Sequence, residues 1–214
     1  KLHAGGPYAG ADTRVTARLR QTRFHSKDPL AKGFQFSSGR HPNRRNWKLH
    51  QQNAEGSDLG EVTIGFELAD QKIVYGRLHV ESAVRDDRGK YVTAAATADY
   101  IGRDRFVGLR NTRWTYDEDK PAQIEYLVVG IDGKPVSDVP VKIRVERRET
   151  KAARVKGAGN AYLTNYVTRW VDLGQFEGLS GAGPSVYAFT PEQPGSYKIS
   201  ATVSDSRQRT HETT

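Results

Sequence analysis

The chain has 214 residues, of which 36% are hydrophobic, none is cysteine and none is methionine, and its net charge is +8. That length makes one large domain or two of ordinary size, and the hydrophobic content is too high for a disordered chain. The lack of cysteine excludes disulfides, cysteine-ligated metal sites, a thiol nucleophile and a thioester within these residues. No run of 18 apolar residues occurs, so we expect no direct insertion into a membrane.

Positive charge is concentrated near the start of the chain. Residues 1–48 contain eleven Lys and Arg against two Asp, which gives +9, so residues 49–214 sum to −1. Such asymmetry favours an anionic partner. Arginines next to aromatic rings could hold phosphates while bases stack on the rings. The residues of this pattern are Arg14, Arg18, Arg20, Arg23, Arg40, Arg44, Arg45 and Lys48, with Phe24, Phe34, Phe36 and Trp47.

An RNA-binding aromatic signature is missing from this basic segment. Arginine on an outer sheet face also keeps a strand edge soluble or contacts a neighbouring domain. We therefore interpret the segment as a solvated or interdomain face, and we expect no specific nucleic-acid partner.

Apolar and polar residues alternate with period 2 along most of the chain, which is typical of antiparallel strands with one face on a core. The predicted strands are 15–19, 62–68, 74–84, 93–98, 103–110, 124–128, 141–145 and 197–203. Turn sequences rich in Asp, Gly and Pro separate them at 86–89, 132–135 and 193–195. Only residues 147–156 are compatible with a helix, and that stretch is short and polar.

These strands predict an all-β protein of two immunoglobulin- or fibronectin-like antiparallel β-sandwich domains in tandem. The division is expected near Tyr100, with residues 1–100 in one domain and 101–214 in the other. Residues 21–60 contain Pro29, Pro42, four glycines and dense charge, so we expect a long irregular loop in the first domain.

Catalytic and metal-binding motifs are incomplete in this sequence. The Gly157–Gly159 stretch lacks the third glycine and the strand–helix setting of a phosphate loop. In Gly178–Gly181 the nucleophile-elbow spacing fails, because Ala182 stands where glycine is needed. The six histidines never pair at metal-ligand spacing, and Asp117–Asp119 fits a solvated turn better than a calcium loop. We therefore predict no catalytic, cofactor-binding or metal-ligating residue, no cofactor and no enzymatic activity.

The clearest architectural signal lies near the end of the chain. Phe189–Tyr197 contains Pro191, Pro194 and Gly195 and leads directly into an alternating strand. In immunoglobulin-like sandwiches a tyrosine at such a corner packs inward while its hydroxyl bonds the preceding backbone. We expect Tyr197 to take that position.

Several segments resemble bacterial alpha-2-macroglobulin, strongly over residues 100–214 and thinly over 21–60. The resemblance lies in Asp104–Arg110, Trp114, Asp132–Pro135, Lys156–Tyr162, Phe189–Tyr197, Asp205–His211 and Gly5–Ala11. Gln208 departs from the family, in which glycine is common at that place. A cysteine pair that some relatives have near Phe176 and Tyr187 is also missing here.

The resemblance implies two consecutive macroglobulin-like domains from the middle of a longer periplasmic chain. Family members trap proteases after cleavage of a bait segment, and many bind the protease through a Cys–Gln thioester. This chain has neither, so no functional residue is carried over. The implied role is a structural scaffold module of a protease inhibitor. Its implied partners are the neighbouring macroglobulin domains, the target proteases of the full-length protein, and other periplasmic or envelope proteins.

Two other functions remain open from the residues alone. One is an immunoglobulin-like stalk of a bacterial surface adhesin, which tandem copies of the same domain in the flanking sequence would favour. The other is a basic nucleic-acid-binding module, which tight binding at physiological salt would favour.

Overall fold

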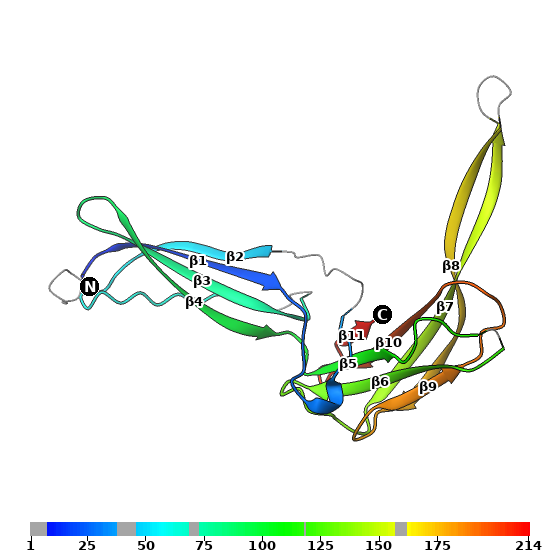
Figure 1. The fold of residues 1–214 in the computed structure, drawn as a ribbon. Coiled ribbons are helices and arrows are strands. Elements are labelled where there is room, and N and C mark those ends of the chain that lie inside the picture. Colours follow the sequence, from blue (N-terminus) through cyan, green and yellow to red (C-terminus); the bar gives the residue numbers. More distant parts are fainter. Residues whose placement is uncertain (1–7, 38–45, 69–72, 118, 157–161) are drawn as a thin grey trace. The chain divides into compact units, whose positions relative to one another are not determined.

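A computed structural model describes the whole chain except residues 1–7, 38–45, 69–72, 118 and 157–161. Strands make up nearly all of its regular structure, and all of them pair antiparallel (Figure 1). The predicted all-β, antiparallel class is therefore confirmed. The chain divides into two compact units, which are residues 1–24 with 40–102, and residues 25–39 with 103–214.

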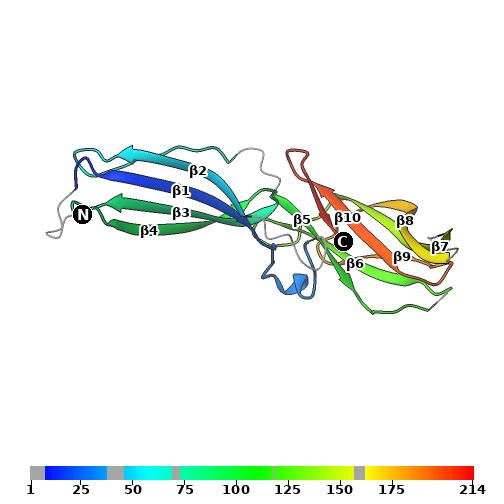
Figure 2. The same cartoon turned by 90° about the horizontal axis from the view of Figure 1, so that it is seen from above.

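The first unit is built on one four-stranded sheet in the order β2-β1-β3-β4 (Figure 2). Its strands are β1 (Asp12–Gln21), β2 (Asn46–Glu55), β3 (Tyr75–Arg85) and β4 (Tyr91–Ile101). One face of β1 is apolar, and Ala17 and Leu19 on that face are fully buried. Burial of this stripe fixes the strand register, because a slip of one residue would expose all of it.

Two predictions for this unit differ from the structure. Residues 61–68 are extended, with alternate residues half-buried, but they form no ladder. The alternation of apolar and polar residues in this segment therefore reflects side-chain burial and not pairing with a neighbouring strand. Conversely, Asn46–Glu55 is strand β2, paired along β1, so the prediction that 21–60 is irregular is wrong for these residues. These residues have mostly charged and amide side chains, which do not show the alternation expected of a strand. The strand forms through backbone hydrogen bonds to β1.

The second unit is a sandwich of two sheets, β5-β6-β9 and β11-β10-β7-β8. Its strands are β5 (Arg105–Asn111), β6 (Ala122–Gly130), β7 (Pro140–Lys156), β8 (Tyr162–Leu179), β9 (Ser185–Phe189), β10 (Tyr197–Ser204) and β11 (Thr210–Thr213). The core lies between the sheets. Its buried members are Val107, Leu109, Ile124, Tyr126, Val128, Val139, Val141, Ile143, Ala201 and Val203.

Residues 25–39, which we call the strap, pack with the second unit. The strap contains a 3-10 turn, η1 (Pro29–Ala31), capped by Asp28, whose carboxylate accepts the Leu30 N–H at 2.9 Å. Gln35 exchanges backbone hydrogen bonds of 2.9 Å with Leu109 of β5. The strap therefore adds to the second unit, whereas the sequence had suggested a loop of the first.

The hairpin of β7 and β8 extends far beyond the body of the second unit (Figure 1). Its two strands pair from Pro140 with Leu179 to Lys156 with Tyr162. The prediction that 147–156 could be helical is thus wrong, because these residues continue β7. Polar residues on both faces of a solvent-exposed ribbon leave no period-2 pattern to detect.

Candidate functional site

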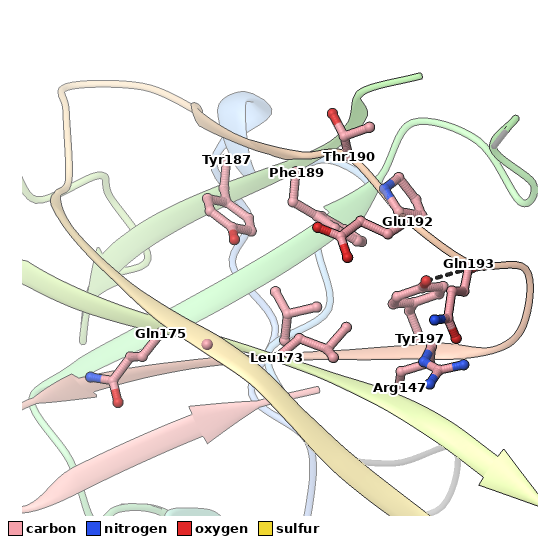
Figure 3. A pocket seen from close by; sticks show the side chains of 12 residues that line it. Arg147, Leu173, Gln175, Tyr187, Phe189, Thr190, Glu192, Gln193 and Tyr197 are labelled. Carbon is pink, nitrogen blue, oxygen red and sulfur yellow. Dashed lines mark hydrogen bonds between the residues drawn. The ribbon is translucent and has the colours of Figure 1, made fainter. Parts of the chain in front are cut away.

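A pocket of about 370 Å³ opens in the second unit where the long hairpin leaves the sandwich (Figure 3). Each of β7, β8, β9 and β10 contributes to its wall, together with the corner that joins β9 to β10. The lining residues are Val145, Arg147, Leu173, Gly174, Gln175, Tyr187, Phe189, Thr190, Pro191, Glu192, Gln193 and Tyr197. Since β8 and β9 are the last strands of their sheets, the pocket lies on an open side of the sandwich.

A row of aromatic rings forms the apolar side of this pocket. The ring of Tyr187 lies 5.0 Å from that of Phe176 and 6.1 Å from that of Phe189, which in turn lies 5.6 Å from Tyr197. Burial raises the pKa of the Tyr187 phenol, so this group stays neutral over the physiological range. Such a row offers a surface for an apolar side chain and no ionised nucleophile.

A β-bulge in β8 forms part of the pocket wall. The pairing runs from Val145 with Gly174 to Glu146 with Asp172, which leaves Leu173 as an extra residue. Gly174 has a φ of +135°, a conformation that glycine adopts readily. Asp172 holds the bulge, since it accepts the Gly174 N–H at 3.0 Å and pairs with Arg144 at 2.9 Å. The Gly174 N–H and then the Arg144 guanidinium lower the pKa of the Asp172 carboxyl. Leu173 is left half exposed at the rim.

The predicted corner tyrosine is confirmed at the end of this pocket. The Tyr197 hydroxyl donates a hydrogen bond of 2.5 Å to the Gln193 carbonyl (Figure 3). Its ring is half-buried and packs on Phe189. The corner therefore fixes the β9–β10 connection that closes one end of the pocket.

A second site lies under the strap, on β5 and β11. The His211 ring is buried, accepts the Val107 N–H on Nδ1 at 3.0 Å, and has Nε2 3.3 Å from the Phe36 carbonyl. Because Nδ1 accepts, the proton lies on Nε2, which donates to Phe36. Burial lowers the pKa of His211 to about 4; the hydrogen bond to Phe36 opposes this shift, and the nearby Arg103 charge adds a smaller lowering effect. A neutral histidine thus links the strap to β5.

Glycine at position 108 makes room for the strap. A Cβ atom there would lie 2.7 Å from the Phe36 ring, closer than such contacts allow. Nearby, the Arg110 guanidinium lies 4.4 Å from the Phe34 ring centroid and donates to the Lys32 carbonyl at 2.6 Å. Sequence reasoning missed this contact. The signal was present, since Phe34 and Phe36 are apolar residues two apart in a polar segment.

The basic residues proposed for phosphate contacts come together only in part. Arg18 and Arg20 line a hollow of about 670 Å³ in the first unit together with Arg23, Arg77 and His79. Arg14 lies over the Tyr91 ring at 5.4 Å, and Lys48 is exposed. In contrast, the aromatic residues Phe24, Phe34 and Phe36 are buried and cannot stack bases. Arg40, Arg44 and Arg45 lie outside the described residues, as does the side chain of Trp47.

Of the rejected motifs, two have structural roles. The Ser180 hydroxyl is buried, donates to the Val136 carbonyl at 2.6 Å and accepts the Val139 N–H at 3.1 Å. Asp117 forms an ion pair of 2.8 Å with Lys120. The Gly157–Gly159 stretch, most of Lys156–Tyr162 and Gly5–Pro7 lie outside the described residues.

Within the described part of the chain, no group of three His, Cys, Asp or Glu side chains is placed to hold a metal ion. In the same residues no helix is long and apolar enough to cross a membrane. The predictions that no residue is catalytic or cofactor-binding stay predictions.

Comparison with known proteins gives a fold and no sequence family. No family model and no curated protein matches. The native Escherichia coli alpha-2-macroglobulin structure matches with a TM-score of 0.58 at 15% identity, over 98% of this chain and 14% of that one. Salmonella alpha-2-macroglobulin reacted with methylamine gives 0.57 at 15%, over 97% and 14%. Escherichia coli alpha-2-macroglobulin activated by porcine elastase gives 0.57 at 14%, over 95% and 18%.

The chain thus spans about one seventh of the length of the first two of these proteins. Identity this low supports the fold and leaves the activity to be proposed. The resemblance seen in the sequence is confirmed at that level: the chain has the macroglobulin-like β-sandwich fold of a segment of bacterial alpha-2-macroglobulins.

Proposed function

We propose that this chain is a structural module of a longer bacterial protein that traps proteases in the manner of alpha-2-macroglobulin. One observation carries the proposal, namely the fold match over 98% of the chain to a single stretch of the Escherichia coli protein. Two matched structures are of forms activated by porcine elastase and by trypsin. In the proposal, the longer protein reacts with proteases and this segment holds part of its scaffold.

The chemistry of the described residues supports a scaffold role. Its buried polar groups serve the fold, as Ser180, His211 and Tyr197 do. The pocket beside Tyr187 offers aromatic surface for an apolar group. We propose that neighbouring macroglobulin-like domains of the longer chain, and envelope proteins, contact this module, and that it resides in the periplasm.

The test uses the longer protein that carries this sequence, incubated with elastase or trypsin. We expect the bound protease to keep its activity on a small peptide substrate and to lose it on a large protein. Ile143→Ala, in the core of the second unit, should reduce trapping because it destabilises the scaffold by about 2–4 kcal/mol. Lys142→Ala, on the solvent side of the same strand, is the matched control and should trap normally.

The isolated 214 residues should neither protect a large substrate nor form a covalent adduct with either protease. Stoichiometric inhibition by the isolated chain would contradict the scaffold role, because the inhibitory element would then lie within it. Tandem copies of the same domain around this sequence, without protease trapping, would favour a surface stalk instead.

A further inference from the structure

The outer part of the β7–β8 hairpin is a ribbon of only two strands. The strand β10 pairs with β7 from Val203 with Val141 up to Tyr197 with Arg147. Beyond that point β7 and β8 continue to pair with each other as far as Lys156 and Tyr162. We call the paired residues 147–156 and 162–171 the arm. Among the described residues, no further strand pairs with its outer part and no layer covers its faces.

A two-stranded ribbon of this kind is marginally stable in water without a third strand or a packed face. The arm nevertheless exposes large apolar side chains: Tyr166 is 68% exposed, Val167 55% and Trp170 43%. Their burial would favour contact with another molecule, since apolar area removed from water contributes about 25 cal/mol per Å². The arm therefore has an exposed apolar surface, and covering that surface with a partner would be energetically favourable.

The edge of β7 presents backbone hydrogen-bonding groups with which another strand could pair. The Arg148 N–H points toward β10, because it donates to the Ser196 carbonyl at 2.9 Å. Backbone groups of alternate residues point to the same side of a strand, so those of Thr150, Ala152 and Arg154 face this edge as well. There β10 has ended, and the described residues supply no strand to meet them. An incoming strand would continue the ladder that β10 leaves.

Charge along the arm differs from charge on the body of the same sheet. On the body, cations meet carboxylates across the strands: Lys142 with Glu177 at 3.3 Å, Arg144 with Asp172, and Lys198 with Glu146. From Thr150 to Val171 the sequence has no Asp or Glu. Arg169 meets Glu149 at 2.9 Å. By contrast, Arg148 and Arg154 are exposed, and neither forms an ion pair within the described part of the chain.

The cross-strand register places cations and aromatic rings on one face. Arg148 is opposite Trp170, Ala152 is opposite Tyr166, and Arg154 is opposite Thr164. Side chains directly opposite share a face, and so do alternate residues. This face therefore suits an anion that also carries apolar groups. A nucleic acid could supply phosphates and bases, but it has no backbone amides to complete the open edge of β7.

We propose that the arm binds an acidic, extended polypeptide segment of a partner protein, which adds as a strand to the β7 edge beyond Arg148. Backbone hydrogen bonds give the contact its direction, and carboxylates on one face of the segment meet Arg148 and Arg154. Apolar side chains on its other face lie on the side of Val167. This inference stands independently of protease trapping, because it rests on the arm alone.

The experiment measures binding of the 214-residue chain to a fluorescent peptide of about ten residues with alternating Glu and Val. At about 150 mM salt, we expect it to bind at least about tenfold more tightly than a peptide of alternating Lys and Val. The double variant Arg148→Glu with Arg154→Glu should weaken binding by about tenfold or more. The matched control Arg18→Glu with Arg20→Glu makes the same charge change on exposed residues of β1 and should leave binding unchanged. If both double variants weaken binding equally, overall charge and not the arm holds the peptide, and the proposal is wrong.

Strand addition is tested separately from charge. Methylation of alternate backbone nitrogens of the acidic peptide removes its hydrogen bonds to one edge and keeps its carboxylates. Binding should then fall by about tenfold, and Ala152→Pro, which removes an edge-facing N–H of β7, should have the same effect. Unchanged binding of the methylated peptide would overturn strand addition whatever the fate of the proline variant. Tighter binding of an oligothymidylate of about 20 nucleotides than of the acidic peptide would assign the arm to nucleic acid, and would also overturn the proposal.

Discussion

The buried His211 predicts that the second unit loses stability in mild acid. Its pKa is lowered to about 4 in the folded chain, mainly because burial disfavours the charged ring, while the unfolded value is 6.5. The unfolded chain therefore binds the proton more readily at any pH between these values. Its contribution is complete above pH 6.5 and is lost progressively as the pH falls toward 4.

The size of this loss follows from the shift. A difference of about 2.5 pKa units corresponds to at most about 3 kcal/mol, and about 2 kcal/mol of it is lost already at pH 5. The geometry gives the same direction. A proton on Nδ1 would face the Val107 N–H at 3.0 Å, so two donors would meet and the bond to β5 would be lost.

Urea unfolding at pH 7.5 and pH 5.0 measures the effect. A Trp47→Phe background leaves Trp114 and Trp170, both in the second unit, as fluorescent reporters. The free energy of unfolding should fall by about 2 kcal/mol more in this protein than in His211→Gln, whose amide does not titrate. His25→Gln, at an exposed position of the strap, is the matched control and should behave like the parent. An equal fall in the parent and in His211→Gln would refute the reasoning, because carboxylates alone would then explain the pH dependence.

Two further predictions concern contacts of the second unit. Tyr197→Phe removes only the hydroxyl bonded to Gln193 and should cost about 1 kcal/mol, whereas Tyr197→Ala also removes ring packing and should cost about 3 kcal/mol; an unchanged urea midpoint in Tyr197→Ala would show that the ring contributes nothing. Gly108→Ala should cost about 1–3 kcal/mol because its Cβ meets the Phe36 ring, and most of that cost should vanish in a Phe36→Ala background. The double-mutant cycle checks this, and additive costs would mean that the strap does not press on Gly108.

The elements that could be predicted are those whose alternation coincides with a two-sided environment. β1, β3 and β10 have one face on a core, so their sequences alternate and their turns carry Asp and Gly. The turn at 86–89 shows why: the Asp86 carboxylate accepts the Arg88 and Lys90 N–H groups, while Gly89 takes a φ of +78°. All the residues that form such a turn lie within a few positions of one another, so the turn can be recognised in the sequence.

The strap and the arm could not be predicted, for opposite reasons. The strap is held by contacts more than 70 residues away along the chain, such as Arg110 with the Lys32 carbonyl and His211 with the Phe36 carbonyl. The sequence around Phe36 does not identify contacts with residues so distant along the chain. Phe36 was therefore interpreted as an exposed aromatic residue beside arginines. The arm has the same solvent on both faces, so nothing forces its side chains to alternate, and its strand character comes from backbone pairing alone.

For a related reason, the net charge of a sequence segment did not indicate where the exposed basic surface lies. The charge of residues 49–214 sums to nearly zero, whereas that of residues 1–48 sums to +9. The sequence therefore indicated residues 1–48 as the basic surface. Among the described arginines of that first segment, Arg14 lies over the Tyr91 ring, and Arg18, Arg20 and Arg23 line a hollow to which Asp99 also contributes. The acid-free stretch from 150 to 171 is cancelled in the sum by carboxylates elsewhere, yet its cations lie together on one exposed ribbon. Electrostatic attraction acts over about 8 Å at physiological salt, so the local arrangement of charge, and not the total for a segment, determines where an acidic partner binds.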